Sequence, residues 1–339
     1  MRYTLAVARH RAGFFIQQTQ RYLQMFKNFI AYRIGANWAA PSLQDLEQTM
    51  QRLRFTPCES MQEESVGWSA PRGKEHDPMM ESISGQWIAK LMIERKSVPA
   101  SAVKNELEKR CKEIEEQRGT APGRRERKQM KEDIYFEMLP RAFAKRSAVT
   151  LWIDTANRML VVGTSSLSAA DLVVAQVIEL MKSANHDIAI SALRTKMSPT
   201  SSMSSWLTTF EAPAGFTVDR ELELKLPDEQ QSTVRYARHA LDIEEVAAHI
   251  HAGKVPTMLA MTWDSRVSFI LTENFTVKKI ELLDDIFVQS EEAAGFDGDV
   301  ALLTGELSKL IPDLVLALGG EAEPDAEGDD TDAGAADVE

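Results

Sequence analysis

The chain of 339 residues has only two cysteines, Cys58 and Cys111, and neither has a histidine nearby. A disulfide framework needs more cysteines, and a structural zinc site needs four closely spaced Cys or His ligands. The closest histidines, His249 and His251, are two residues apart on an expected helix, so their rings diverge by roughly 200° and cannot bind one metal from the same face. We therefore expect two reduced thiols, and neither a metal nor a cofactor.

Long apolar runs and the common catalytic signatures are also missing. No stretch of about 18 apolar residues is available to cross a bilayer, so we expect a soluble, cytoplasmic protein with no membrane partner. No Walker loop occurs, because the nearest glycine-rich piece, residues 119–123, is followed by Arg124 and Arg125. Neither a G-x-S-x-G nor a Cys-His signature appears, nor a recognisable pair of catalytic carboxylates. The sequence therefore predicts a protein that is not an enzyme.

Charge is distributed unevenly along the chain, whose formal net charge is -12. Residues 321–339 hold nine Asp and Glu and no Lys or Arg, whereas residues 1–24 hold four Arg and no acid. Residues 25–320 therefore sum to -7. Net acidity argues against nucleic acid, because Lys and Arg supply most non-specific affinity for phosphates. The distribution leaves room for local basic patches.

Both ends of the chain differ from its body. Met25 directly precedes residues 26–33, which are predicted to form a first strand, so we expect residues 1–24 to be an upstream extension and Met25 a plausible start. A transit-like amphipathic segment is the alternative, although no cleavage region is recognisable. Residues 323–339 cannot bury enough apolar surface to order themselves, and we expect a disordered acidic tail.

Residues 86–146 predict a strand followed by a two-helix arm. Apolar residues at period two predict a half-buried strand over 86–94. Pro99 suits a first helical turn, apolar residues then recur at helical spacing to Ile114, and residues 119–123 end this helix. A second helix is predicted from Arg124 to Met138, because the residue before Pro140 avoids helical geometry.

The rest of the chain predicts an α+β fold, in which strands and helices do not alternate regularly. Two hairpins are predicted, one joining 149–154 to 159–164 and the other joining 257–263 to 267–272. Helices are predicted over 169–183 and, after a capping box at Asp242, over 243–252. Thr304 is predicted to cap a last helix that ends at Gly319 and is kinked by Pro312. The buried stripe of that helix is predicted to be Leu307, Leu310, Ile311, Leu314 and Leu318.

Basic residues gather on the predicted arm. Such clustering is what phosphate contact requires, but a solvated helix face of mixed charge is the alternative, because Glu126, Glu132 and Asp133 are interspersed. A weaker patch precedes and follows the helix at 243–252. The arm cluster consists of Arg124, Arg125, Arg127, Lys128 and Lys131, with Arg141, Lys145 and Arg146 after it. The weaker patch consists of Arg235, Arg238, His239 and Lys254.

Phe143 lies between Arg141 and Lys145, an apolar ring among cations at the end of the arm. Such a residue either packs into its own core or docks on a partner. General residue preferences favour burial within its own subunit, because phenylalanine is more often a core residue than a contact residue.

Short motifs distributed from about residue 25 to 322 resemble, in order and with similar spacing, the RdgC family of recombination-associated bacterial proteins. The most specific pair is Leu-Pro-Arg-Ala-Phe at 139–143 followed by Trp-Ile-Asp-Thr at 152–155. Residues 1–24 and the acidic tail lie outside the resemblance. The other matching motifs are Phe26-Lys27-Asn28, Phe55-Thr56-Pro57-Cys58, Gly67-Trp68, Ala252-Gly253-Lys254, Leu303-Thr304-Gly305-Glu306 and Ala317-Leu318-Gly319-Gly320-Glu321-Ala322.

The resemblance implies a crescent-shaped subunit that closes into a ring-shaped homodimer around double-stranded DNA, which it binds without sequence preference. It implies a central subdomain (25–96 and 148–190), a helical tip arm (97–147) and a base (191–322). The family's tip contact maps onto Phe143, and its base contact maps onto Arg238 and His239, where the histidine departs from the family's amide. The implied DNA-binding residues are Lys104, Arg124, Arg125, Arg127, Lys128, Lys131, Arg141, Lys145, Arg146, Arg235, Arg238 and Lys254.

The implied function is to restrain recombination on the nucleoid by limiting the access of RecA to duplex DNA. We expect the acidic tail to compete with DNA for the basic hole, on the ground of its charge alone. One alternative is a regulator that acts mainly by contacting RecA or another protein. The other is a metal-dependent nuclease, for which Asp154, Asp264 and Glu306 are the candidate ligands.

Overall fold

The computed structural model describes residues 25–74, 76–227, 232–237, 241, 243–283 and 295–322, which form two compact units. The first unit contains the described residues up to Ser191 together with 295–302. The second contains those from Ala192 to Leu283 together with 303–322. Helices and strands follow one another without regular alternation, which confirms the predicted α+β class.

The first unit is built on a sheet with the strand order β2-β4-β5-β6-β1, in which β3 pairs with β4 beyond the end of β2 and β7 pairs with β1. The strand at 86–94 is confirmed as β4, with Trp87, Leu91 and Ile93 buried. The hairpin predicted after residue 149 is confirmed as β5 and β6, and β5 begins five residues earlier. The strands are β1 Asn28–Ile34, β2 Glu64–Ser69, β3 Met80–Ile83, β4 Gln86–Lys96, β5 Ala144–Asp154, β6 Met159–Val162 and β7 Ile190–Ala192.

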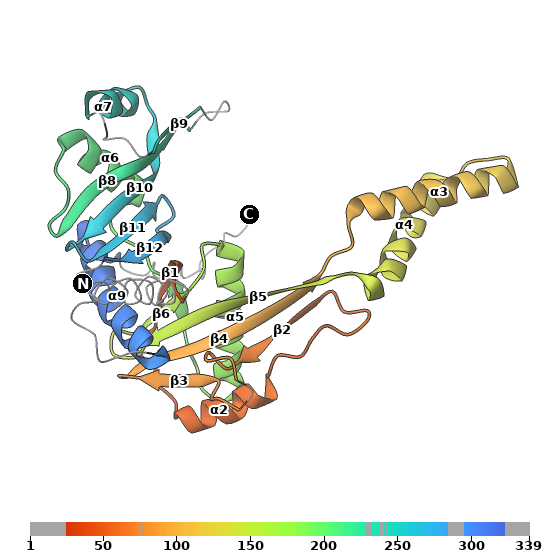
Figure 1. Ribbon diagram of the computed structural model, residues 1–339, viewed down its shortest axis with the longest axis horizontal. Helices are drawn as coiled ribbons and strands as arrows, with labels where there is room; N and C mark the ends of the chain where they lie inside the picture. The colour runs from red at the N-terminus through yellow and green to blue at the C-terminus, as the bar shows by residue number, and fades with distance from the viewer. Residues whose placement is uncertain are drawn as a thin grey trace, which may run out of the picture. The chain divides into compact units, whose positions relative to one another are not determined.

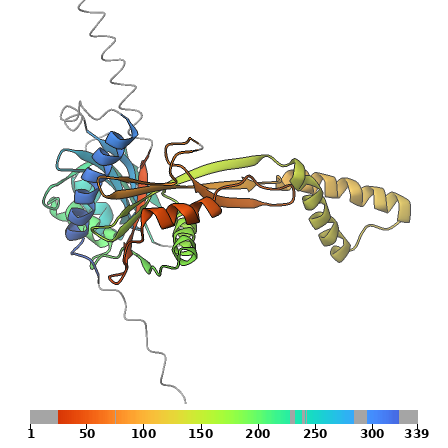
Figure 2. The ribbon, with the colours of Figure 1, turned by 90° about the horizontal axis from the view of Figure 1, so that it is seen from below.

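Two helices, α2 (Leu43–Arg52) and α5 (Leu167–Ser183), cover one face of this sheet (Figures 1 and 2). Each begins at a serine whose hydroxyl accepts a backbone N–H of the first turn, Ser42 for α2 and Ser166 for α5. Their apolar sides pack on the sheet in one core, and α5 confirms the helix predicted over 169–183.

Strands β4 and β5 lead into the arm, and β2 pairs with β4 as far as Glu64 opposite Arg95 (Figure 1). The arm consists of α3 (Ala100–Arg118), α4 (Arg124–Met138) and the short 3-10 helix η1 (Leu139–Arg141), which confirms both predicted helices. Gly119 ends α3 in the left-handed conformation. The arm has a small core of its own, formed by Val98, Val103, Ile134 and Leu139.

The second unit is an antiparallel sheet with the order β9-β8-β10-β11-β12. Helix α6 packs on β10 and β11, and α7 packs on α6. The predicted hairpin at 257–272 and the helix at 243–252 are confirmed as β10 with β11 and as α7. The elements are α6 Pro199–Thr209, β8 Phe216–Lys225, β9 Thr233–Tyr236, α7 Ile243–His251, β10 Val255–Trp263, β11 Val267–Thr272 and β12 Val277–Leu282.

Helix α9 (Phe296–Ala317) begins in the residues assigned to the first unit and continues into the second. The prediction that Thr304 caps this helix is wrong, because Thr304 is buried in its interior. Asp297 and Asp299 occupy the true first turn, where acids favour the positive end of the helix dipole. The predicted buried stripe is confirmed. In the part of the chain that the structure describes, no helix combines the length and apolarity needed to span a membrane.

Gly67 on β2 allows another segment to cross the strand closely. A Cβ placed on Gly67 would lie 2.5 Å from Phe55 Cα and 2.6 Å from Phe55 N. The Phe55 N–H donates to the Trp68 carbonyl at 2.9 Å, and the Trp68 N–H donates to the Leu53 carbonyl at 3.0 Å. The segment 53–58 is therefore held against β2 by backbone contacts that only glycine at position 67 permits.

We predict that Gly67→Ala lowers the free energy of unfolding by about 1–3 kcal/mol, because the methyl group meets backbone that cannot move without losing these hydrogen bonds. Gly305→Ala is the matched control, since a Cβ there meets nothing within 4 Å and alanine favours the helix by about 0.5–1 kcal/mol. Urea unfolding of both variants measures the difference. Equal stability of Gly67→Ala and the unaltered protein would contradict the close approach.

Candidate nucleic-acid interface

One face of α4 carries a stripe of cations. Arg124, Arg127, Lys128 and Lys131 have the spacing i, i+3, i+4, i+7, which places them on the same side of a helix, and all four are exposed. Lys128 lies 4.0 Å from Glu132, an exposed pair of little strength. Among the described residues, Arg124, Arg127 and Lys131 make no ion pair. We call these four residues the α4 stripe.

Three acids of the arm bind arginines of α3, and two of these pairs connect α3 with α4. Arg110 on α3 binds Glu106 at 3.1 Å and reaches Glu137 on α4 at 2.6 Å. Arg118 binds Glu126 on α4 at 2.8 Å. The pairs Arg110–Glu137 and Arg118–Glu126 join the two helices, whereas the cations of the α4 stripe are exposed to solvent.

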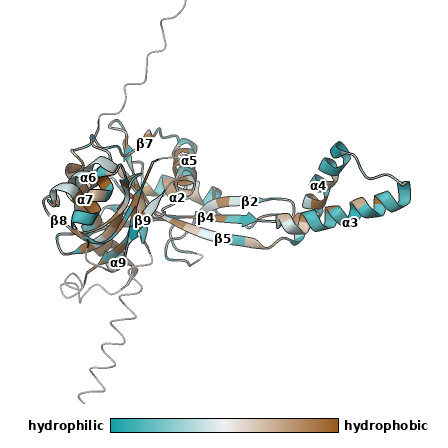
Figure 3. Ribbon diagram, turned by 90° about the horizontal axis from the view of Figure 1, so that it is seen from above, coloured by the Kyte–Doolittle hydropathy of each residue, from teal (hydrophilic) through white to brown (hydrophobic). Residues whose placement is uncertain are grey.

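The arm as a whole is basic within an acidic chain. Residues 97–147 contain thirteen Lys and Arg and nine Asp and Glu, so their net charge is +4 in a chain of net charge -12. Figure 3 shows α3 and the first turns of α4 as predominantly hydrophilic. Lys104 and Arg125, also predicted to contact DNA, are exposed on α3 and α4, and Lys104 lies 3.8 Å from Glu108.

A second group of cations lies where the arm joins the sheet. Residues 144–148, the first five of β5, are exposed, and they include Lys145 and Arg146. Arg141 in η1 is exposed as well. Lys145 pairs in register with Arg95 of β4, whose guanidinium binds Glu64 at 2.7 Å. We call this region, the paired ends 94–96 and 144–146, the neck.

Arg146 differs from the other predicted DNA contacts because a buried acid holds it. Its Nε donates to Glu94, whose side chain is 3% exposed, while the Arg146 side chain is 55% exposed. The other Glu94 oxygen accepts the backbone N–H of Cys58 at 2.8 Å. The hydrogen bond from Arg146, with that from Cys58, holds the pKa of Glu94 below its ordinary value.

The weaker patch predicted in the second unit is only partly described. Arg238 and His239 lie outside the described residues, and Lys254 is half-buried after α7. Arg235 is exposed on β9, in register with Glu223 of β8. Burial raises the pKa of Glu223, but hydrogen bonds from Thr257 and Lys225 and the charges of Lys225 and Arg235 outweigh burial and lower it. Arg235 is therefore balanced by a neighbouring carboxylate, unlike Arg124, Arg127 and Lys131 of the α4 stripe.

Phe143 is 94% exposed, so the general preference for burial within its own subunit is wrong at this position. It stands at the edge of a hollow of about 470 Å³ where α3 meets the end of α4. The hollow has apolar walls from Val98, Ala102, Met138 and Ala142, and a charged rim from Glu106, Arg110, Glu137 and Arg141.

Two of the three acids considered for a nuclease have structural partners. Asp154 is fully buried and caps a turn, accepting the Asn157 N–H at 3.0 Å and its side-chain amide at 2.8 Å. Glu306 is buried against Arg266, which it binds through both oxygens at 2.7 and 2.8 Å. Asp264 is exposed in the β10–β11 turn. Within the described ranges, no three His, Cys, Asp or Glu side chains are grouped closely enough to hold a metal ion.

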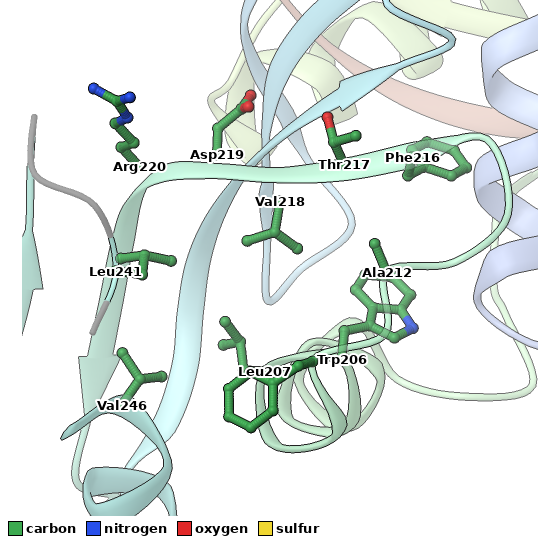
Figure 4. Close-up of a pocket in the computed structure, with 11 residues that line it drawn as sticks. Trp206, Leu207, Ala212, Phe216, Thr217, Val218, Asp219, Arg220, Leu241 and Val246 are labelled. Atoms are coloured by element: carbon green, nitrogen blue, oxygen red, sulfur yellow. The ribbon is translucent and has the colours of Figure 1, made fainter. Parts of the chain in front are cut away.

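The second unit also contains an apolar pocket of about 470 Å³ between α6, β8 and α7. In Figure 4, Val218 points into this pocket, whereas Thr217, Asp219 and Arg220 point to the other side of β8. Trp206, Leu207, Phe210, Phe216, Leu241 and Val246 complete its wall. The wall of the pocket is therefore mainly apolar, with Thr217, Asp219 and Arg220 as its polar residues.

Comparison with known proteins gives one consistent result. Residues 25–321 match the family model described as "Putative exonuclease, RdgC". The chain is 39% identical over 304 residues to the recombination-associated protein RdgC of Dechloromonas aromatica, covering 87% of this chain and 98% of that protein. It is 41% identical over 301 residues to the protein of the same name from Herminiimonas arsenicoxydans, with the same coverage.

The ion pair at the neck should make the free energy of unfolding depend on pH. Because the folded pKa of Glu94 lies below its ordinary value of 4.5, Glu94 contributes its full stabilisation above pH 4.5 and loses it as the pH falls through the lowered folded value. We predict that the difference in unfolding free energy between the unaltered protein and Glu94→Gln is largest at neutral pH and shrinks below pH 4.5. Urea unfolding across this range measures the difference, and a difference independent of pH would count against the ionised pair.

Proposed function

The chain belongs to the RdgC family, and from this premise we propose that it binds double-stranded DNA without sequence preference through its basic arm. The observation that carries the proposal is the α4 stripe, four exposed cations on one face of a helix in an otherwise acidic chain. These side chains suit phosphate contact, which fixes a protein on DNA but reads no sequence.

The dimensions of the stripe fit the DNA backbone. Seven residues of helix rise by about 10 Å. Over that length each strand of a duplex carries about three phosphates. Lys145 and Arg146 at the neck extend the same basic character to the base of the arm. The stripe and the neck together therefore supply enough cations to neutralise several phosphates.

We propose further that two crescent-shaped subunits close into a ring through their arms. An aromatic side chain that is 94% exposed beside an apolar hollow of about 470 Å³ fits a symmetric contact, in which Phe143 of each copy enters the hollow of the other. Arg238 and His239 are the proposed base contact and lie outside the described residues. The basic arms would then face the enclosed duplex.

A ring of this kind would act by covering the duplex DNA that it encloses. The relatives are named recombination-associated proteins, which supports a role in recombination. We propose that the ring limits the access of the RecA filament to the duplex on the nucleoid and so restrains strand exchange. The alternative, direct contact with RecA, is tested by a pull-down without DNA, in which retention of RecA would favour the alternative.

The description of the matching family also names an exonuclease. A nuclease would require acids free to bind a divalent cation, but Asp154 is occupied by Asn157 and Glu306 by Arg266. These contacts favour binding over hydrolysis.

We predict that the logarithm of the duplex-binding constant falls steeply with the logarithm of salt concentration, because each neutralised phosphate contributes about -0.9 to the slope. Replacing Arg124, Lys128 and Lys131 by alanine should reduce the slope by up to about 2.7 and weaken binding equally for different sequences. Fluorescence anisotropy with random-sequence duplexes measures both quantities.

The control variant replaces three exposed lysines outside the arm by alanine, Lys74, Lys182 and Lys309. Its salt slope should stay near that of the unaltered protein. Absence of duplex binding at low salt would refute DNA binding. A slope that the arm variant does not change would refute the assignment to α4.

We predict that Phe143→Ala weakens the dimer by about 100-fold or more, because a symmetric contact loses the ring twice and each buried ring is worth about 1.5–3 kcal/mol. Sedimentation velocity over a concentration series measures the dissociation constant. Phe136→Ala is the matched control, since Phe136 is another exposed aromatic residue of the arm. Equal dimerisation of the Phe143→Ala variant and the unaltered protein would exclude the tip contact.

A further inference from the structure

Arg146 is held in one orientation at the neck, whereas most exposed arginines are free to change rotamer. It lies directly across the ladder from Glu94 and donates its Nε–H to that carboxylate. The ring of Phe55 lies against the guanidinium, with 5.6 Å between the Arg146 Cζ atom and the ring centroid. Among the described residues, no protein acceptor binds its Nη1 or Nη2 atom.

The groups that hold Arg146 are themselves fixed. Glu94 is buried, and its second oxygen is bound by the Cys58 N–H, so the carboxylate cannot rotate away without losing a hydrogen bond. Phe55 and Cys58 belong to the segment 53–58, which Gly67 allows to lie against β2. Two strands and a crossing segment therefore form one cradle around a single guanidinium.

Such a cradle matters for phosphate binding because of conformational entropy. Ordering a long side chain at an interface costs conformational entropy, and a side chain that is ordered beforehand avoids that cost on binding. Arginine has five N–H donors in a planar fork, and Glu94 uses the one on Nε. The four on the Nη atoms remain to bind a phosphate. Lys145, exposed beside it, has no comparable support within the described chain.

We propose that Glu94 and Phe55 are positioning residues, which hold the Arg146 guanidinium in the orientation that binds a phosphate of the DNA backbone. The inference rests on the proposed DNA binding and adds to it a specific supporting group.

The direction in which Glu94→Gln changes duplex affinity separates a positioning role from a purely electrostatic one. An acid close to DNA repels phosphate, so removing its charge should tighten binding if Glu94 acts only through its charge. If Glu94 positions Arg146, Glu94→Gln should weaken binding, since a neutral amide holds the guanidinium less firmly. We expect a loss of about two- to tenfold in duplex affinity, which corresponds to the entropy of one released side chain.

The experiment measures anisotropy with a random-sequence duplex for Glu94→Gln, Arg146→Ala and the double variant, with thermal unfolding recorded for each. Arg146→Ala should reduce the salt slope by about 0.9, the value for one phosphate. Glu94→Gln should weaken binding when Arg146 is present and have no effect on the Arg146→Ala background. Asp133→Asn is the matched control, because it removes the charge of an arm acid that is hydrogen-bonded by Gln129 and, among the described residues, makes no ion pair. The affinity of this variant should be unchanged or higher.

Equal or tighter binding by Glu94→Gln would overturn the proposal, as would an equal loss with and without Arg146, which would indicate a general structural role. An unchanged affinity of Arg146→Ala would overturn it while leaving the proposed function intact. Failure of the unaltered protein to bind duplex would instead refute the proposed function. If Glu94→Gln does not fold, Phe55→Leu replaces it in the same cycle, and a loss that depends on Arg146 is again the supporting result.

Discussion

The basic arm depends on the pairing between β4 and β5. Eleven consecutive residue pairs join the two strands, from Gln86 with Asp154 to Lys96 with Ala144. The inner pairs, such as Trp87 with Ile153, are buried in the core of the first unit, whereas the β5 residues of the outer pairs, 144–148, are exposed. On its other edge β4 pairs with β2, from Ser69 opposite Lys90 to Glu64 opposite Arg95, so three strands lead towards the neck. The inner pairs supply the apolar burial, and pairing on both edges of β4 fixes the direction of its outer half.

The neck contains a buried carboxylate at the point where the core ends. A buried ion pair is not a strong source of stability, because desolvation offsets much of the attraction, and apolar residues often serve as well. What Glu94 supplies is geometry, since its two oxygens tie β5, through Arg146, and the segment 53–58, through Cys58, to the same point on β4. Where few apolar contacts exist to fix the strands, directional hydrogen bonds can fix them instead.

Local features were predictable from the sequence, and contacts distant along the chain were not. Helices α3 and α4 follow from apolar spacing, Gly119 and Pro140, all of which act within a few residues. The pairing of Arg146 with Glu94 joins residues 52 positions apart, so no local pattern distinguishes this arginine from Lys145.

Phe143 and Thr304 also show that local sequence patterns do not determine tertiary contacts. Phe143 shows that residue preference cannot decide exposure, because the arm has too small a core to cover another ring. The error at Thr304 arose because an interior threonine bears the same side chain as a cap, and the buried Val300 and Leu303 extend the apolar stripe in front of it.

The net charge of the chain does not determine the charge of each local surface. Charges in water are screened over about 8 Å at physiological ionic strength, a distance close to the length of the α4 stripe. A phosphate against α4 therefore interacts mainly with the stripe and with the arm's own acids. Several of those acids are already bound, Glu106 and Glu137 by Arg110 and Glu126 by Arg118. Because part of the arm's negative charge is neutralised by neighbouring arginines and its cations outnumber its acids, a strongly acidic chain can present a locally basic surface.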